Sequence, residues 1–267
     1  MTTSWHEGPL ALFDVESSGV DPHRDRIVTA AVISVVPGCQ PLTKTWLINP
    51  GIPIPEGAAA IHGITTEHAT AHGMDPAQGV AEIAFELDRL TRLGHAIVGH
   101  NVPYDLTMLH AELLRWGRMD LAEPIRLIRP VIDTMVLDLW ADPYRPKAPT
   151  TRRPDPARCG SRKLIDACRV YGVELSEADA HGAAADALAA GRLAWRIARA
   201  YPGCQMPARD AHDFLSAEKR RQADKFGAWL TSQGKTDDVS RAYPVALPPV
   251  GWTGSDLPVV RETEAVA

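Results

Sequence analysis

Two acidic residues near the start of the chain have a spacing that could bind a metal ion. Asp14 and Glu16 follow the apolar residues 10–13, and a turn sequence over residues 17–19 comes directly after them. Residues two apart in a strand point to the same face. Two carboxylates at the end of a buried strand need a cation, and their oxygens favour hard divalent ions such as Mg²⁺ or Mn²⁺. A solvated turn remains the alternative for this stretch.

A third acid, Asp105, is expected to reach the same place. Residues 96–99 form a short apolar segment, which is typical of a buried strand. Pro103 suits the first turn of the helix expected over residues 104–116, because its missing N–H is not needed there. Asp105 would then lie in the first turn of a helix that begins where a strand has just ended, within reach of the first two carboxylates.

His181 and Asp186 stand at the beginning of an alanine-rich helix expected to run to about Tyr201. On one continuous helix, five residues turn by roughly 140°, which would direct the two side chains apart. A helix that begins near Gly182 leaves His181 in the preceding loop, where it can face the pocket into which Asp186 projects. The helix dipole favours an anion in the first turn, and an imidazole titrates near neutrality, as a general base requires. A surface histidine is the alternative.

The rest of the pattern predicts an α/β protein. The first three strands, joined by short turns, indicate an antiparallel meander. Asp133 is interpreted as the N-cap of the helix that follows the last strand. Further strands are expected over residues 26–36, 42–49 and 128–132, and further helices over residues 75–93, 134–140, 162–171 and 210–233.

The composition excludes several classes of protein. The chain has 267 residues and 45% hydrophobic content, which is enough for a packed core. Its net charge of -5 means that contact with nucleic acid would depend on local basic patches. The four cysteines form no CxxC pair, which disfavours a zinc ribbon or a disulfide scaffold. No apolar stretch approaches the length of a membrane span, so we expect a cytoplasmic protein without membrane contact.

Two regions are basic or amphipathic and stand outside the predicted site. Residues 142–160 interleave prolines with arginines and a lysine, which indicates a solvated surface loop or a contact for a phosphate backbone. The helix over residues 210–233 has an apolar face and basic residues; packing on the main domain is favoured over docking of a partner or nucleic acid. We therefore divide the chain into residues 1–204 and a C-terminal extension over residues 205–267.

Three short motifs resemble those of the DEDDh (DnaQ-like) exonucleases, a group that includes the proofreading subunit of bacterial replicative polymerase, RNase T and oligoribonuclease. The motifs are FDVESSG at residues 13–19, GHNVPYD at residues 99–105 and HGAAAD at residues 181–186, in the family's order. IHGIT at residues 61–65 is similar to an additional signature of the polymerase-proofreading branch. The resemblance covers roughly residues 9–200.

The resemblance implies an RNase H-like α/β fold, with a mixed five-stranded sheet flanked by helices and a C-terminal helical extension outside the match. It implies two Mg²⁺ or Mn²⁺ ions, with Asp14 as the ligand shared by both, and His181 as general base. Serines stand at residues 17–18 where paired threonines are commoner, and tyrosine at residue 104 where phenylalanine is; neither removes a ligand. The implied metal ligands are Asp14, Glu16, Asp105 and Asp186, and the implied substrate contacts are His62, Gly63, Ser17, Asn101 and Tyr104.

The expected function is metal-dependent 3′–5′ exonuclease activity on single-stranded ends, with release of nucleoside 5′-monophosphates. The motifs do not read the 2′-hydroxyl, but the segment around His62 favours DNA over RNA. The alternatives are a non-catalytic module that binds 3′ ends or associates with a polymerase, and an RNA exonuclease similar to RNase T or oligoribonuclease. The expected partners are 3′ ends of DNA or RNA, and a polymerase or repair protein at the C-terminal helix. Both a homodimer and a place in a larger assembly occur in the family.

Overall fold

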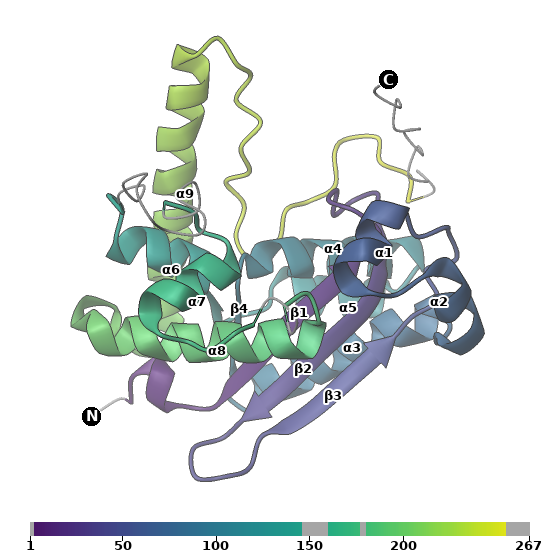
Figure 1. The fold of residues 1–267 in the computed structure, drawn as a ribbon, viewed down its shortest axis with the longest axis horizontal. Helices are drawn as coiled ribbons and strands as arrows, with labels where there is room; N and C mark the ends of the chain where they lie inside the picture. Colours follow the sequence, from purple (N-terminus) through teal and green to yellow (C-terminus); the bar gives the residue numbers. More distant parts are fainter. Residues whose placement is uncertain (1–2, 146–159, 177–179, 255–267) are drawn as a thin grey trace.

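A five-stranded sheet lies at the centre of the molecule, with helices on both faces (Figure 1). The structure is a computed structural model, and it describes residues 3–145, 160–176 and 180–254. The strand order is β3-β2-β1-β4-β5; the first three strands are antiparallel, and β4 and β5 run parallel to β1. The predicted mixed sheet is therefore confirmed. The strands are β1 (Leu10–Ser17), β2 (Ile27–Val35), β3 (Leu42–Leu47), β4 (Ala96–Gly99) and β5 (Val131–Asp133).

The two faces of the sheet are covered by different sets of helices. Helices α3 (Pro76–Arg92), α4 (Val102–Arg115) and α5 (Met119–Arg126) form the layer on one face. The layer on the other face consists of α6 (Thr134–Ala141), α7 (Leu164–Tyr171), α8 (Ala183–Ala200) and α9 (Ala208–Ser232). Two short helices, α1 (Glu56–His62) and α2 (Thr66–His72), follow β3, and 3-10 turns span Trp5–Glu7 and Pro202–Cys204.

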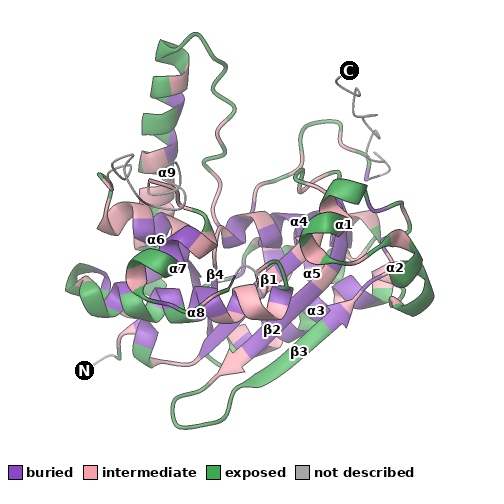
Figure 2. Cartoon of the chain, viewed as in Figure 1, coloured by how far each residue is buried: buried purple, intermediate pink, exposed green. Residues whose placement is uncertain are grey.

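Strand β1 divides its side chains between the two layers. Phe13 and Val15 are buried with α3 and α4, whereas Leu10 and Leu12 are buried with α8. Because side chains alternate along a strand, the even-numbered residues that follow Leu12 also face the α8 layer. The purple centre of Figure 2 shows the resulting buried core.

Helices α1, α2 and α5 were not predicted from the sequence. The pattern predicted an extended connection over residues 50–55 and no helix before residue 75, but Glu56–His62 is helical and ends at Gly63, whose φ is 77°. No residue of α1 is buried, so it has no apolar stripe that could reveal a helix. Helix α5 contains Pro124, which argues against a helix when the sequence alone is considered.

The first half of α9 packs on the main body, as expected. Ala211 and Leu215 are buried in the same core as α8, and two residues of the extension contact the outer edge of β5. The N–H of Val131 donates to Nδ1 of His212 over 3.1 Å, and the Tyr243 hydroxyl donates to the carbonyl of Val131 over 2.8 Å. The extension therefore supplies partners for backbone groups of an edge strand, which otherwise invite pairing with other chains.

Beyond Gln222 the second half of α9 projects away from the body (Figure 1). The chain then returns beside this half of the helix and crosses to α4, where the N–H of Ala246 donates to Thr107 Oγ1. The expected basic loop over residues 142–160 and the end of the expected tail fall largely outside the described residues. None of the helices in the described ranges is long and apolar enough to cross a membrane.

Candidate active site

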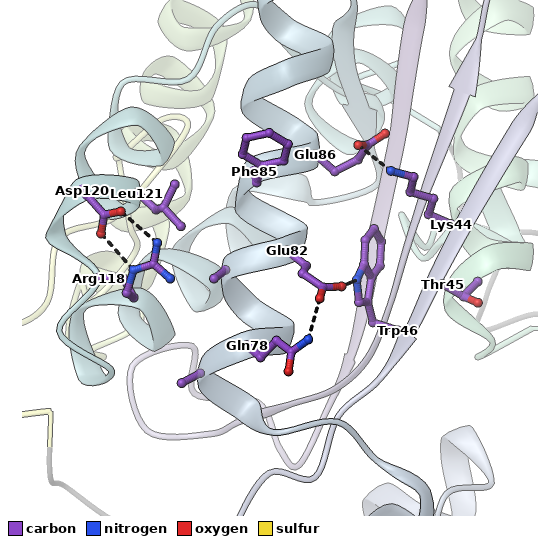
Figure 3. A pocket seen from close by; sticks show the side chains of 12 residues that line it. Lys44, Thr45, Trp46, Gln78, Glu82, Phe85, Glu86, Arg118, Asp120 and Leu121 are labelled. Atoms are coloured by element: carbon purple, nitrogen blue, oxygen red, sulfur yellow. Dashed lines mark hydrogen bonds and ion pairs between the residues drawn. The ribbon is translucent and has the colours of Figure 1, made fainter.

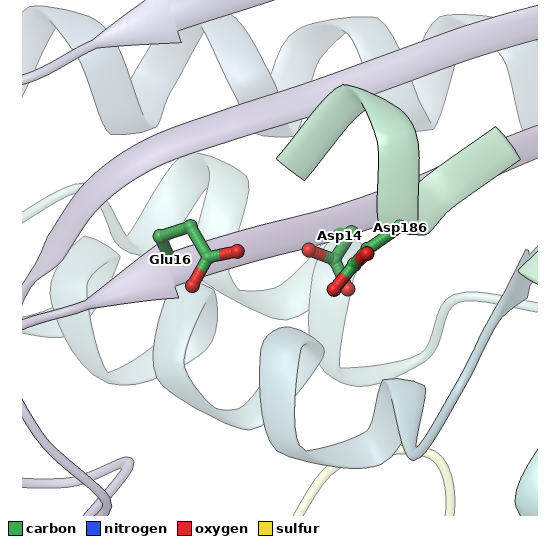
Figure 4. Close-up of side chains that lie close together, drawn as sticks. All are labelled: Asp14, Glu16 and Asp186. Atoms are coloured by element: carbon green, nitrogen blue, oxygen red, sulfur yellow. The ribbon is translucent and has the colours of Figure 1, made fainter. Parts of the chain in front are cut away.

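Three carboxylates meet between β1 and the beginning of α8. Asp14 and Glu16 come from β1, on the face that α8 covers, and Asp186 comes from the first turn of α8. Each offers one carboxylate oxygen, and these oxygens all lie within 4.8 Å of one another (Figure 4). Asp14 and Glu16 point to the same face of β1, as their spacing of two residues predicted. A register shift between β1 and β2 lies beside Glu16, in agreement with the frequent position of bulges next to active sites.

Close packing of α8 on β1 brings Asp186 to this position. Gly182 is the N-cap of the helix, which begins at Ala183 as predicted. One and a half turns beyond Asp186, a Cβ at Gly191 would stand only 2.5 Å from Leu12 Cδ1. A side chain at this position would therefore displace Leu12 or move α8 away from β1, which carries Asp14.

His181 lies in the loop before α8, as predicted, and its side chain is exposed. Its backbone has a φ of 68°, in the left-handed region that residues with a Cβ seldom adopt. The N–H of His181 donates to Oδ2 of Asp186 over 3.3 Å. The loop is therefore tied by its backbone to one of the three carboxylates.

Asp105 lies in the first turn of α4, as predicted, but outside the group of three. It is buried, and its Oδ1 accepts a hydrogen bond from the N–H of Val15, which stands between Asp14 and Glu16 in β1. Burial raises the pKa of Asp105 well above its ordinary value, against the hydrogen bond from Val15. The structure thus places Asp105 against β1, close enough for its charge to act on Asp14.

The electrostatics of the three carboxylates are those of a cation site. Burial, and then the charges of Asp105, Glu16 and Asp186, raise the pKa of Asp14 well above its ordinary value. Burial and Asp186 raise the pKa of Glu16 to about 7. Oδ1 of Asp186 is buried and has no hydrogen-bond partner among the described residues. A divalent cation would remove the repulsion and use the free oxygen, so the residues fit Mg²⁺ or Mn²⁺.

Ser17 and Tyr104 hold the turn that follows β1. The Tyr104 hydroxyl donates to the carbonyl of Gly19 over 2.7 Å, and Ser17 Oγ donates to the same carbonyl over 2.7 Å. The two hydroxyl oxygens lie 3.1 Å apart. These expected substrate contacts therefore also fix the shape of the turn beside Glu16.

His62 and Gly63 lie at the end of α1, next to the same turn. Nδ1 of His62 accepts a hydrogen bond from the N–H of Ile64 over 3.1 Å, and Nε2 is buried without a hydrogen-bond partner in the described ranges. Burial lowers the pKa of His62, and the backbone of Ser17 beside it acts in the opposite direction. The ring of His62 therefore lies beside the backbone of Ser17, at the end of β1.

Asp133 makes a second contact in addition to its predicted role as the N-cap of α6. Its Oδ1 accepts from the N–H of Met135, which caps α6 as predicted, and also from the N–H of Asn101, both over 2.9 Å. Asn101 has a φ of 60° and is the N-cap of α4. Asp133 thereby fixes the beginning of the helix that carries Asp105. No sequence signal showed this second contact, because it joins residues 32 positions apart.

The sequence matches the RNase T exonuclease family over residues 12–194. The chain belongs to this exonuclease family. The match includes both acids of β1, Asp105, His181 and Asp186, and the prediction of an enzyme of the exonuclease class is confirmed at the level of the family.

Two relatives of this exonuclease domain are named as polymerase III proteins. A DNA polymerase III subunit epsilon-like protein of Rhodobacter capsulatus is 32% identical over 131 residues, which are 48% of this chain and 17% of the relative. A PolC-type DNA polymerase III of Lacticaseibacillus paracasei is 28% identical over 186 residues, which are 70% of this chain and 11% of the relative. The exonuclease domain thus spans only a small part of these relatives.

Solved structures show the same fold. The structure of Escherichia coli exonuclease I in complex with a dT13 oligonucleotide matches with a TM-score of 0.54 and 21% identity, over 83% of this chain and 46% of the other. Exonuclease I of Methylocaldum szegediense matches with a TM-score of 0.57 and 20% identity, over 83% and 46%. The exonuclease domain therefore has the expected RNase H-like fold, although the chain spans less than half of these proteins.

Proposed function

We propose that this exonuclease domain hydrolyses single-stranded nucleic acid from the 3′ end, prefers DNA, and releases nucleoside 5′-monophosphates. The observation that carries the proposal is the approach of three carboxylates with raised pKa values, from Asp14, Glu16 and Asp186. The family membership supports nucleic acid as the substrate. The solved relative that binds a dT13 oligonucleotide supports single-stranded DNA.

We assign the metal ligands on the same observation. Asp14, Glu16 and Asp186 would hold the ions, with Asp14 shared and Asp105 behind it as the fourth acid. Two Mg²⁺ or Mn²⁺ ions, when bound, would stabilise charge on the attacking and leaving oxygens of an in-line displacement at phosphorus. The chain's own contribution is a fixed, partly buried set of negative charges that repel one another until cations are present.

His181 is the proposed general base. Its loop position lets the exposed ring move over the carboxylates, while the hydrogen bond from its N–H to Asp186 keeps its backbone in place. The ring would accept the proton of the attacking water, and a positioned base contributes about 10²–10⁴-fold to the rate.

The remaining predicted contacts surround the turn after β1. We propose that Ser17, Tyr104 and Asn101 shape the pocket through the bonds described above, and that His62 and Gly63 contact the terminal nucleotide. The buried, unpartnered Nε2 of His62 supports a hydrogen bond to a polar ligand group. A terminal base must leave its stack before its phosphate can reach the carboxylates, which favours single strands.

We retain two further proposals about the chain as a whole. Residues 1–204 would form the catalytic unit, with residues 205–267 as an extension that packs on it. The names of the relatives support an association with a polymerase, for which α9 is the proposed contact.

The test is digestion of matched 5′-labelled DNA and RNA oligonucleotides, with Mg²⁺, with Mn²⁺ and with a chelator. A ladder that shortens from the 3′ end, needs a metal and forms faster on DNA is expected. A 3′-phosphate on the DNA is the matched control for polarity, because it should delay the ladder. Binding of the 3′ end without any ladder would favour the non-catalytic module, and a faster ladder on RNA would favour the RNA exonuclease.

A further inference from the structure

The projecting half of α9 carries two exposed aromatic rings. Phe226 and Trp229 stack with ring centroids 5.6 Å apart and an angle of 13° between the planes, and each residue is 51% exposed. The two rings lie on the same side of α9 as Leu215, which is buried in the core. They belong to the half of the helix that projects from the body (Figure 1). A near-parallel pair leaves an open π face, which can stack on a flat group.

Two lysines lie on the same side of the helix as the rings, at 100° of rotation per residue. Lys219 and Lys225 stand three residues before and three residues after Gln222, and the two acids of this segment are engaged by arginines: Glu218 by Arg221, and Asp224 by Arg241 over 2.7 Å. In a chain whose net charge is -5, this is a local positive patch. Aromatic rings among cations are typical of single-stranded nucleic-acid surfaces.

The base of the projecting half lies near the candidate active site. Gln222 Nε2 donates to the carbonyl of Val136 in α6 over 3.0 Å. Burial raises the pKa of Asp133 at the end of β5, and the charges of His100 and Lys219 oppose this effect, so Lys219 lies near that strand end. Strands β1, β4 and β5 are parallel, so their carboxyl ends share one edge of the sheet. At 1.5 Å per residue, the two rings lie about 6 and 10 Å beyond Gln222.

We propose that Phe226 and Trp229, with Lys219 and Lys225, form a second nucleic-acid contact, the arm surface, which binds the single strand behind the 3′ end held in the active site. This inference rests on the proposed function. A base would stack on the exposed ring face and the two lysines would contact phosphates, without a preference for sequence.

The test uses the full chain with Phe226→Ala and Trp229→Ala combined. Binding of a fluorescent twenty-nucleotide oligothymidylate is measured in chelator, where no hydrolysis occurs, and circular dichroism verifies the fold. We expect roughly tenfold weaker binding, because stacking of one base contributes about 1–3 kcal/mol. Trp195→Ala is the matched control: Trp195 is also a helical tryptophan, 43% exposed, with Arg199 5.4 Å from its ring. Its binding should be unchanged.

Hydrolysis of trithymidylate with Mg²⁺ separates this inference from the proposed function. The double variant should hydrolyse the trinucleotide at the wild-type rate, since a short substrate reaches only the active site. Undiminished binding of the long oligonucleotide by the double variant, or an equal loss in Trp195→Ala, would overturn the arm surface. If the wild type binds the long strand through the arm but hydrolyses neither substrate, the arm surface stands and the proposed function fails.

Discussion

The backbone N–H of His181 donates to the Oδ2 oxygen of Asp186, 3.3 Å away. This bond ties the proposed general base to a proposed metal ligand and leaves the buried Oδ1 of Asp186 for a cation. It depends on the left-handed backbone of His181, at a φ of 68°. This contact is made by the backbone of His181 and not by its imidazole.

Replacement of His181 should therefore slow the chemical step and leave the loop intact. Asparagine tolerates the left-handed region better than most residues, so His181→Asn keeps the backbone while it removes the base. We expect kcat to fall about 10²–10⁴-fold with little change in KM. Steady-state rates over a range of oligonucleotide concentrations measure both quantities, and a rise in KM alone would contradict the assignment. His181→Ala should show the same loss of kcat, with additional strain in the loop.

Glu16 should make metal binding depend on pH. Its pKa is raised from 4.5 to about 7 by burial and by Asp186. A cation must displace this proton below about pH 7, so Mg²⁺ affinity should increase as the pH rises toward that value. Calorimetry in buffers of different ionisation enthalpy should detect the released proton. Affinity that does not change from about pH 5.5 to pH 8 would contradict this reading of Glu16.

The raised pKa of Glu16 also predicts how the stability of the metal-free protein changes with pH. A carboxyl whose pKa is raised in the folded state contributes stability below its unfolded pKa, and this stability is lost as the pH rises through the folded value. In chelator, the wild type should therefore lose Tm relative to Glu16→Gln between about pH 4.5 and pH 7. Glu174→Gln removes an exposed carboxylate elsewhere and serves as the control. If the Tm of all three proteins changed with pH in the same way, the raised pKa of Glu16 would be contradicted.

Gly191 should be essential for the position of Asp186. A Cβ there would lie 2.5 Å from Leu12 Cδ1, and the two methyl groups of Gly191→Val would crowd this buried side chain further, so we expect α8 to move away from β1. Overpacking of this kind costs about 1–3 kcal/mol, and Asp186 would move away from Asp14. We expect weaker Mg²⁺ binding together with a lower Tm. Gly57→Ala is the control, because a Cβ at Gly57 meets nothing within 4 Å; equal effects of both changes would refute the argument.

His212 should stabilise the edge of the sheet. Its Nδ1 is the partner of the Val131 N–H, and burial lowers the pKa of His212, which keeps the ring neutral and able to accept. His212→Ala leaves that N–H without its partner and should cost about 1–3 kcal/mol of unfolding free energy. Denaturant titration gives this value. His23→Ala, at a partly exposed histidine outside this edge, is the comparison; a loss no greater than in that variant would contradict the role of His212.

Local patterns predicted the parts of the molecule that depend on local physics. The alternation of β1 placed Asp14 and Glu16 on one face, and Gly182 set the beginning of α8, so that His181 fell in the loop. Both results follow from the periods of strand and helix. That Asp186 would meet the acids of β1 was implied only by the family resemblance, because no local rule joins residues so far apart in the chain.

Long-range contacts account for what the sequence could not predict. The N–H of Val15 donates to Oδ1 of Asp105 across 90 positions, and this contact places the carboxylate against β1. His212 and Tyr243 meet at Val131 from different parts of the extension. Helix α1 was missed for a different reason: it buries no residue, so its only signals were alanines and the closing glycine.

The most direct test of the carboxylate centre is Mn²⁺ binding measured together with hydrolysis, in the wild type and in Asp14→Ala. The free ion is followed by electron paramagnetic resonance, and the same samples digest a single-stranded oligonucleotide. The wild type should bind two ions and hydrolyse DNA in proportion to their occupancy, whereas Asp14→Ala should remain folded, bind fewer ions and show no hydrolysis. Undiminished hydrolysis in Asp14→Ala, or hydrolysis by the wild type without bound ions, would contradict the assignment of this site.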